Sequence, residues 1–421
     1  MNADPGAAAA PESRESLFRS FFLGGFECST HRRKDGRRLD LIEGTRHDRF
    51  AREDYRRLRD VGIETARDGV RWHRVEEIPG RYAWDSVLPM IRAARETDTQ
   101  VIWDLLHFGW PDHVDVFSPS LPERFRRFVG AFLDVLTGED GRAPLIAPVN
   151  EISFLSFAAG EEGFFYPYAQ KRGDEIKAQL VRAAIEACEE ILTRRPDARI
   201  IHTDPIINIV ADPTRPEDRL TAEGYRLSQF ESWDMISGRS RPELGGQSRY
   251  LDVIGANYYI QNQWIHEGRV LVPSHPQHLP LRYMLRETYR RYRRPLFIAE
   301  TGIEADARPR WLRYIGREVR GANALGVPVE GVCLYPIVNH PGWDDDRHCL
   351  NGLWDYAEED GRRAIDPPFA SEIRRQRYLR ETGAPPAATD EAEIELLDVA
   401  AKEMEEVTDR SRETGPAPIA N

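Results

Sequence analysis

The chain has 421 residues, a formal net charge of -12 and 41% hydrophobic residues. The hydrophobic fraction can fill a sizeable core, whereas the negative charge argues against nucleic acid as a partner, because phosphate binding needs a basic surface. No apolar run approaches the roughly 18 residues that span a bilayer, and the first residues lack the basic and apolar regions of a signal peptide, so we predict a cytoplasmic protein with no membrane partner.

The composition divides the chain into three predicted parts. Residues 1–16 are rich in Ala, Pro and Glu, which predicts a disordered N-terminal tail. Residues 17–382 carry a regular alternation of strand-like and helix-like patterns, which predicts a single folded domain. Residues 383–421 form an acidic tail that we expect to be mostly disordered, with an amphipathic helix possible from Glu391 to Val407.

Eight strand-like apolar runs alternate with helical patterns between these tails. The predicted strands lie within Phe21–Ser29, Glu64–Trp72, Gln100–Phe108, Pro144–Glu151, Arg199–Ile206, Asp252–Tyr259, Pro295–Gly302 and Val329–Ile337. The predicted helices are Asp48–Val61, Ser86–Glu96, Pro122–Leu136, Asp174–Arg194, Leu279–Tyr292 and Arg308–Leu325. Strand–helix alternation implies parallel strands, and eight such units close an α/β barrel, the (β/α)8 or TIM barrel.

A doubly wound open sheet is the alternative architecture. Such a sheet normally carries a glycine-rich phosphate-binding turn after its first strand. The corresponding residues here, Leu23-Gly24-Gly25-Phe26, do not form that motif. The pattern therefore favours the barrel.

Polar residues end most of the predicted strands, where the catalytic residues of a barrel lie. They are Arg67, Asp68, His107, Asn150, Glu151, His202, Asp204, Asn257, Tyr259, Glu300, Asn339, His340 and Trp343. Amides, imidazoles and carboxylates suit sugar hydroxyls, and aromatic rings suit the apolar faces of sugars. The segment 152–170, rich in Phe and Tyr, is either a hydrophobic plug over the barrel or one wall of a sugar site.

Glu151 and Glu300 end the fourth and seventh predicted strands and are expected to face each other across the barrel mouth. Retaining glycoside hydrolysis uses such a pair: one carboxylic acid protonates the leaving oxygen while an ionised carboxylate attacks the anomeric carbon. We predict Glu151 as acid/base and Glu300 as nucleophile, about 5–5.5 Å apart. The charge of Glu300 would raise the pKa of Glu151 and keep it protonated near neutrality.

Asn150-Glu151 and the segment 298–302, Ile-Ala-Glu-Thr-Gly, resemble motifs of the clan A glycoside hydrolases, most closely the family 1 β-glycosidases, over roughly residues 21–357. The resemblance implies a (β/α)8 barrel in which Glu151 is the acid/base, Glu300 is the nucleophile and Asn150 holds the substrate 2-hydroxyl. It also implies that the remaining substrate-binding residues are Arg67, His107, Asn257, Tyr259, which touches the nucleophile, and Trp343, which is a platform for the sugar.

Several positions depart from the family 1 pattern. Pro148 and Ile152 replace the ends of the Thr-x-Asn-Glu-Pro motif, and Thr301 replaces the Asn that follows the nucleophile. Gly342 stands where the family has a Glu that grips the far hydroxyls of the sugar. Glu27 is a poor substitute for the Gln of the first strand. The reaction class is therefore better indicated than the sugar.

The predicted activity is retaining hydrolysis of O-glycosidic bonds in a carbohydrate or glycoside substrate, β-glucosidase-like, with neither cofactor nor metal. A transglycosylase would share the glycosyl-enzyme, and a non-catalytic sugar-binding barrel is a second alternative. A metal-dependent barrel hydrolase is a third, with ligands among His107, His202, Asp204 and His340. Such sites usually begin with His-x-His on the first strand, and the first predicted strand here has no His.

Overall fold

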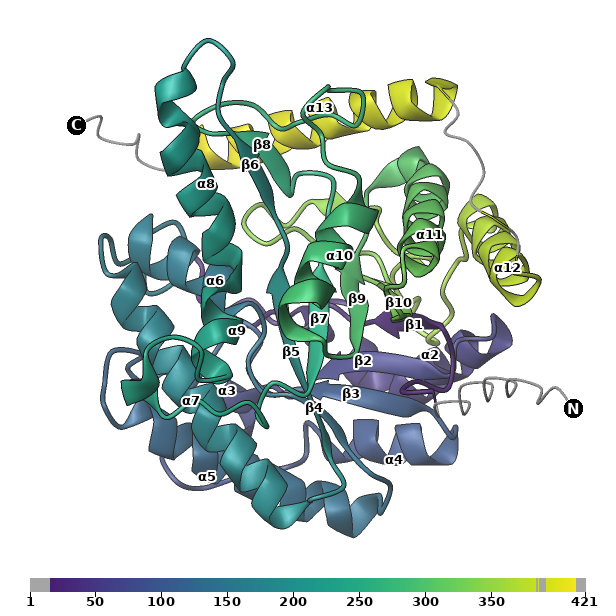
Figure 1. Ribbon diagram of the computed structural model, residues 1–421. Helices are drawn as coiled ribbons and strands as arrows, with labels where there is room; N and C mark the ends of the chain where they lie inside the picture. The colour runs from purple at the N-terminus through teal and green to yellow at the C-terminus, as the bar shows by residue number, and fades with distance from the viewer. Residues whose placement is uncertain (1–15, 384, 386–390, 414–421) are drawn as a thin grey trace, which may run out of the picture.

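The structure is a computed structural model that describes residues 16–383, 385 and 391–413. Eight parallel strands close into a barrel at its centre (Figure 1). They are β1 (Phe22–Gly25), β2 (Thr65–Gly69), β3 (Gln100–Asp104), β4 (Leu145–Ala147), β5 (Arg199–Pro205), β7 (Val253–Asn257), β9 (Leu296–Thr301) and β10 (Val329–Leu334). Because β1 pairs with both β2 and β10, the sheet closes on itself. This confirms the predicted (β/α)8 barrel and excludes the open sheet.

One hydrophobic core fills the inside of the barrel, and a second lies between the barrel and its helices. Leu23, Ile102, Ile201, Val253 and Phe297 belong to the inner core, and each is 0% exposed. Side chains alternate between the two faces of a strand, so their sequence neighbours pack toward the helices. Burial on both faces explains why the strands appear in the sequence as nearly continuous apolar runs.

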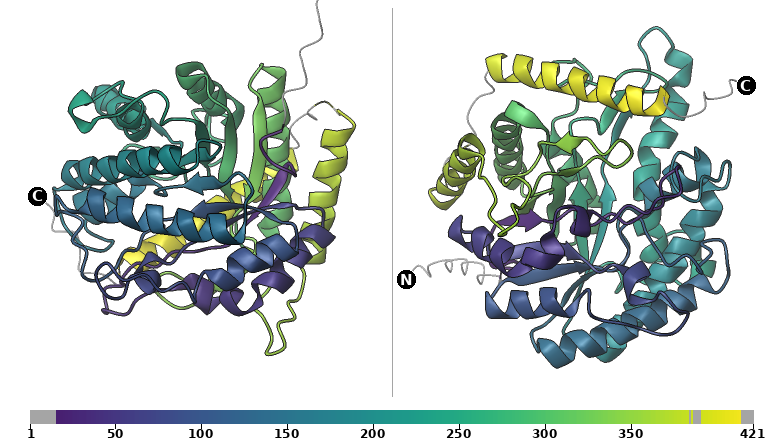
Figure 2. Two further views of the ribbon diagram at one scale, coloured as in Figure 1. Left: turned by 90° about the horizontal axis from the view of Figure 1, so that it is seen from below. Right: turned by 180° about the vertical axis from the view of Figure 1, so that it is seen from behind.

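Helices form a layer around the strands, as the two views of Figure 2 show. The predicted helices are present within a few residues of their expected ends, as α2 (His47–Asp60), α4 (Leu88–Glu96), α5 (Leu121–Glu139), α7 (Gly173–Arg194), α10 (Leu281–Tyr292) and α11 (Arg308–Ala324). An additional helix, α12 (Pro367–Glu381), follows the last strand and packs against α11.

The packing of α7 illustrates why these segments are helical. Ile176, Leu180 and Ala184 recur every four residues and are fully buried, which gives the helix one apolar face. Asp174 and Glu175 lie in its first turn, where acidic side chains interact favourably with the helix dipole. This face packs against α5 in the outer core.

Short elements fill the connections. The helices among them are α1 (Leu41–Gly44), α3 (Trp72–Val75), α6 (Ile152–Ser156), the π-helix η1 (Phe157–Glu161), α8 (Arg219–Leu227), α9 (Glu231–Ile236) and the 3-10 turns η2 (Pro216–Asp218), η3 (Ser228–Phe230), η4 (Pro242–Leu244) and η5 (Ala305–Ala307). β6 (Asn208–Val210) pairs with β8 (Gln263–Ile265), and β11 (His340–Pro341) pairs with β12 (His348–Cys349). Elements this short carry too little periodicity to be recognised from the sequence.

The helix α13 (Glu391–Glu413) is longer than the one expected within the C-terminal tail. It lies across one side of the barrel near α11 and η5 (Figure 1). Leu397 is fully buried and Ala401 is almost so, while Asp398 accepts a hydrogen bond from the backbone N–H of Ser274 at 3.1 Å. The predicted N-terminal tail, apart from Ser16, and the rest of the C-terminal tail beyond residue 413 lie outside the described residues. Within the described ranges, every helix is too short or too polar to cross a bilayer.

Candidate active site

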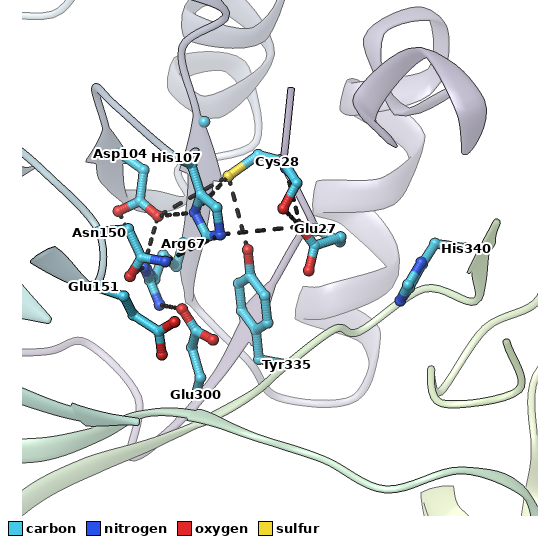
Figure 3. Close-up of polar contacts among 12 residues, drawn as sticks. Glu27, Cys28, Arg67, Asp104, His107, Asn150, Glu151, Glu300, Tyr335 and His340 are labelled. Carbon is cyan, nitrogen blue, oxygen red and sulfur yellow. Dashed lines mark hydrogen bonds and ion pairs between the residues drawn. The ribbon is translucent and has the colours of Figure 1, made fainter. Parts of the chain in front are cut away.

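Two buried glutamates lie at the C-terminal end of the barrel. Glu300 is the second-to-last residue of β9, and Glu151 follows β4 by a few residues. Glu151 is 8% exposed and Glu300 is 5% exposed. Figure 3 shows the two carboxylates pointing toward one another. Burial, and then the charge of Glu300, raise the pKa of Glu151 well above its usual range.

The backbone of Glu151 adopts an unusual conformation that turns its side chain into the mouth. Its φ of 49° lies in the left-handed region, which is uncommon for a residue other than glycine. Its N–H donates to the carbonyl of Thr203 at 2.9 Å. Asp204 anchors the helix that follows, because its carboxylate accepts hydrogen bonds from Ser153 N, Ser153 Oγ and Ser232 Oγ. Burial raises the pKa of Asp204 to about 6.

Arg67, from the end of β2, is a fully buried cation beneath the two glutamates. Its Nη1 donates to Glu300 Oε1 at 2.7 Å, and its Nη2 donates to Asn150 Oδ1 at 2.8 Å. Nε donates to Asp104 Oδ1 at 3.1 Å, and Nη2 lies 2.7 Å from Asp104 Oδ2. All three nitrogens therefore contact protein acceptors. Because these nitrogens are already paired, Arg67 is better suited to positioning Glu300 than to contacting a substrate.

His107 and Asn150 are joined in the same network. His107 Nδ1 lies 3.0 Å from Asp104 Oδ2, a carboxylate oxygen that can only accept, so we assign the ring proton to Nδ1. Nε2 then accepts a hydrogen bond from Asn150 Nδ2 at 3.1 Å. Asn150 Oδ1 also accepts from Thr203 Oγ1 at 2.7 Å. The Asn150 amide is thus oriented from both ends.

Two residues that follow one another closely at the end of β7 each hold one glutamate. Asn257 Nδ2 donates to Glu151 Oε1 at 2.8 Å, and Tyr259 OH donates to Glu300 Oε2 at 2.9 Å. Burial and the charges of Glu300 and Glu151 raise the pKa of Tyr259 well above its usual range, so it stays protonated and can donate. Asn257 Oδ1 is buried and has no partner within the described structure.

Trp343 is the one predicted site residue that the described contacts leave outside this hydrogen-bonded network. Its ring lies 5.6 Å from that of Phe165 and 5.7 Å from those of Phe108 and His31. Phe154 also packs against Phe108 and Phe165. These five rings form what we call the aromatic cluster. Two of them come from the segment 152–170, so that segment contributes a hydrophobic cover close to the mouth.

Four residues of the site were missed or undervalued by the sequence analysis. Asp104 ends β3 and binds both Arg67 and His107. The Tyr335 ring lies 5.1 Å from the Arg67 guanidinium, and Cys28 Sγ lies 3.2 Å from His107 Nδ1. Glu27 Oε1 accepts from Ser29 N at 2.9 Å and lies 3.9 Å from His107 Nε2, so a fourth carboxylate joins Glu151, Glu300 and Asp104. These residues are Glu27, Cys28, Asp104 and Tyr335, and the signal available for Asp104 was a charged residue ending an apolar run.

Cys28, Asp104 and His107 form the one set of three metal-ligating side chains that converge within the described residues, with ligand atoms within 4.8 Å of one another. The chemistry of the set does not fit a metal site. Asp104 is already paired with Arg67 through both oxygens. Burial and the nearby charges of Asp104 and Glu27 raise the pKa of the Cys28 thiol well above its usual range, so beside these carboxylates the group is a neutral thiol.

The residues of the alternative metal site do not converge. His202 points to the outer layer, where its Nε2 lies 3.0 Å from the Tyr250 carbonyl and 3.6 Å from Cys188 Sγ. His340 contacts Asn351 at 3.0 Å in the loop after β10. Asp204 is bound by serines, as described above. Among the remaining strand-end residues, Asp68 faces α2 and Asn339 donates to Asp355.

Solved structures of β-glycosidases are similar to this protein. The β-glucosidase from Thermotoga maritima in complex with glucoimidazole has a TM-score of 0.70 and 14% identity, over 88% of this chain and 99% of that chain. A second structure, the family 1 β-glucosidase of the same organism, gives a TM-score of 0.69 and 14% identity, over 88% of this chain and 99% of that chain. The β-glycosidase from the hyperthermophile Thermosphaera aggregans gives 0.69 and 16%, over 91% and 99%.

No family model matches the chain, and no curated protein matches it. The structural likeness to family 1 β-glucosidases confirms the expected resemblance at the level of the fold, which is what identities of 14–16% can establish.

Proposed function

We propose that the protein is a retaining glycoside hydrolase that cleaves O-glycosidic bonds, with Glu151 as acid/base and Glu300 as nucleophile. The observation that carries the proposal is the difference between the two carboxylate environments. Glu300 is paired with the Arg67 cation and accepts from Tyr259, whereas the side chain of Glu151 is bonded to the neutral amide of Asn257. When the environments of two neighbouring carboxyl groups push their pKa values apart, the group that stays protonated serves as the acid and the ionised group serves as the nucleophile.

In the first step the ionised Glu300 attacks the anomeric carbon. Glu151 gives its proton to the glycosidic oxygen as the bond from that oxygen to the anomeric carbon breaks. The alcohol leaves, and the sugar is held as an ester of Glu300. Arg67 and Tyr259 keep the Glu300 carboxylate oriented for attack.

In the second step Glu151 acts as the base. Once Glu300 is esterified its negative charge is gone, so the pKa of Glu151 falls and the ionised form becomes accessible. Glu151 takes a proton from water while the water oxygen attacks the anomeric carbon and Glu300 leaves as a carboxylate. Two inversions at the same carbon give net retention.

The other predicted residues have proposed roles around the reacting carbon. Asn150 offers its second amide N–H to a sugar hydroxyl while His107 orients that amide, Asn257 orients Glu151, and Trp343 forms an apolar surface for a sugar ring. The similar Thermotoga maritima enzyme is solved with glucoimidazole, which supports a glycoside as the ligand of this mouth. We place these functions in the domain of residues 17–382, outside α13.

The test is a screen of aryl α- and β-glycosides with the wild type and the Glu300→Ala variant. We expect release of the aryl alcohol by the wild type, and NMR of the first product should show the anomeric configuration of the substrate. An inverted product would contradict the double displacement, which requires carboxylates about 5–5.5 Å apart. Equal release by wild type and variant would contradict the assignment of Glu300.

A further inference from the structure

His31 is a buried histidine whose ring has no polar partner. It lies in the loop after β1 and is 2% exposed. Neither Nδ1 nor Nε2 has a hydrogen-bond partner within the described residues. A buried polar group left unpaired typically costs about 1–3 kcal/mol. Such a group calls for a partner outside the folded chain, either an ordered water or a ligand.

The ring of His31 belongs to the aromatic cluster and lies near the mouth of the proposed active site. Its centroid is 3.9 Å from that of Phe165 and 5.7 Å from that of Trp343. The preceding residue, Thr30, donates its N–H to the carbonyl of His107 at 3.4 Å. Burial, and then the charges of Arg33 and Arg38, lower the pKa of His31 to about 3. The ring is therefore neutral near pH 7, with one nitrogen that donates and one that accepts.

An unpaired ring nitrogen alone does not identify a binding residue. His202 also has an unpaired Nδ1, but its ring faces α7 on the outside of the barrel and its Nε2 contacts the Tyr250 carbonyl. His31 differs because both of its nitrogens are unpaired and because its neighbours are the aromatic rings beside the mouth. These two observations together point to a ligand.

Gly342, which precedes Trp343, has no side chain that could contact a ligand beside that ring. A Cβ at Gly342 would lie 2.0 Å from Asp345 Oδ1 and 3.2 Å from Arg347 Cγ, so a longer side chain would displace both neighbours. The side chain that instead approaches Trp343 with free hydrogen-bonding atoms is His31.

We infer that His31 is a specificity-determining residue that binds a hydroxyl group of the glycosyl unit seated beside Trp343. The inference rests on the proposed glycosidase function and specifies how that site selects its sugar. A carboxylate can accept hydrogen bonds from two adjacent hydroxyls, whereas a neutral imidazole offers one donor and one acceptor. Because the two ring nitrogens point away from each other, the contacted hydroxyl pairs with one of them, as donor or as acceptor, and the neutral ring supplies no charge to hold an anionic sugar.

The variant His31→Phe tests this because it keeps a ring against Phe165 and removes both polar atoms. We expect kcat/KM for the best aryl glycoside to fall about 10- to 100-fold, as when a buried polar contact to substrate is lost. For the analogue that lacks the contacted hydroxyl, wild type and variant should be equal. Thermal stability should be unchanged or higher, because two unpaired polar atoms leave the interior.

His202→Phe is the matched control, since it changes a buried histidine outside the proposed site. It should lower the melting temperature, because the Tyr250 carbonyl loses its partner, and leave kcat/KM within about twofold of wild type. A His31→Phe variant whose kcat/KM equals that of the wild type, both for the parent aryl glycoside and for every analogue that lacks one hydroxyl, would overturn the inference.

Binding of glucoimidazole, measured by calorimetry, separates this inference from the proposed function. Weaker binding to His31→Phe than to the wild type supports the role of His31 even if no aryl glycoside is hydrolysed. Equal binding, or binding to neither protein, contradicts it. If the wild type binds glucoimidazole but hydrolyses no aryl glycoside, the proposed function is contradicted and the inference about His31 is not.

Discussion

Two adjacent residues of β2 begin two buried charge clusters with opposite properties. Arg67 points into the barrel and begins the inner cluster, which contains Asp104, His107, Asn150 and Glu300. Asp68 points outward and begins the outer cluster of Asp68, His47, Tyr55, Asp54 and Arg363. Alternation of side chains along a strand explains how two neighbours serve different layers.

The side chains of the outer cluster are hydrogen-bonded to one another. His47 donates to Asp54 and Asp68 at 2.8 Å each, Tyr55 donates to Asp68 at 2.5 Å, and Arg363 binds Asp54 at 2.7 Å and 2.9 Å. At the inner cluster, by contrast, the neighbouring Asn257 Oδ1 has no partner in the described part of the chain. A fully paired buried network stabilises and specifies a fold, whereas a network with an unpaired polar atom can form a hydrogen bond with a ligand.

The largest effect should come from Glu300→Ala, which removes the proposed nucleophile. Turnover of an aryl glycoside should fall by roughly four orders of magnitude or more, because the covalent route is lost. Azide should restore activity by attacking the substrate directly, and the glycosyl azide should have the inverted configuration by NMR. An azide product with retained configuration would exclude Glu300 as nucleophile.

Glu151→Ala should have a smaller effect that depends on the leaving group. Loss of the proton donor should slow substrates with poor leaving groups by about 10²- to 10⁴-fold. A dinitrophenyl glycoside needs little protonation, so its burst of dinitrophenol should persist while the second step becomes slow. Azide should then give a product of retained configuration. A variant that is equally slow in the burst with both kinds of leaving group would contradict the acid/base role.

The outer cluster should behave in the opposite way when it is broken. His47→Phe keeps the ring stacked on Phe26, whose centroid lies 3.7 Å from that of His47, but leaves Asp54 and Asp68 without their shared donor. Breaking a buried ion pair typically costs about 3–5 kcal/mol. We therefore expect a large loss in the free energy of urea unfolding, with kcat/KM of the folded enzyme nearly unchanged. The same substitution at His31 should show the reverse pattern.

The sequence predicted the barrel and the two glutamates because both are local features. Buried strands appear as apolar runs, and Glu151 and Glu300 stand at the ends of two such runs. The supporting residues depend on how the barrel closes. Cys28 contacts Tyr335 across 307 positions of sequence, and Arg67 contacts Glu300 across 233. Strand order and register decide such contacts, and periodicity within one segment does not contain that information.

Even at the strand ends where the two glutamates lie, local patterns left details undetermined. Glu151 has a left-handed backbone, and its N–H donates to Thr203 while that of Ser153 donates to Asp204; both acceptors belong to the next barrel strand. His31 has no motif, since a single histidine in a polar loop carries no periodic signal. Its unpaired nitrogens become evident only once Phe165 and Trp343 are placed around it.

The smallest effect, a dependence of stability on pH, also separates the two clusters. Burial lowers the pKa of His47, but the charges and hydrogen bonds of Asp68 and Asp54 outweigh it and raise that pKa to about 9. In the unfolded chain the value is about 6.5. Since folding raises the pKa, the folded state binds a proton that the unfolded state releases between these two values. The contribution of the charged His47 is therefore complete below about pH 6.5 and is lost progressively as pH rises through about 9, a difference of at most roughly 3 kcal/mol. Urea unfolding at pH 6 and pH 9.5 should show the wild type losing stability at the higher pH, and His47→Phe should lose up to roughly 3 kcal/mol less, because the four buried thiols, whose pKa values are raised by burial, contribute equally to the loss in both proteins. His31→Phe should lose slightly more stability than the wild type over this interval, by less than about 1 kcal/mol, because unfolded His31 is still largely protonated at pH 6 whereas the folded ring is neutral. Equal slopes in the wild type and His47→Phe would mean that the outer cluster does not hold a charged histidine.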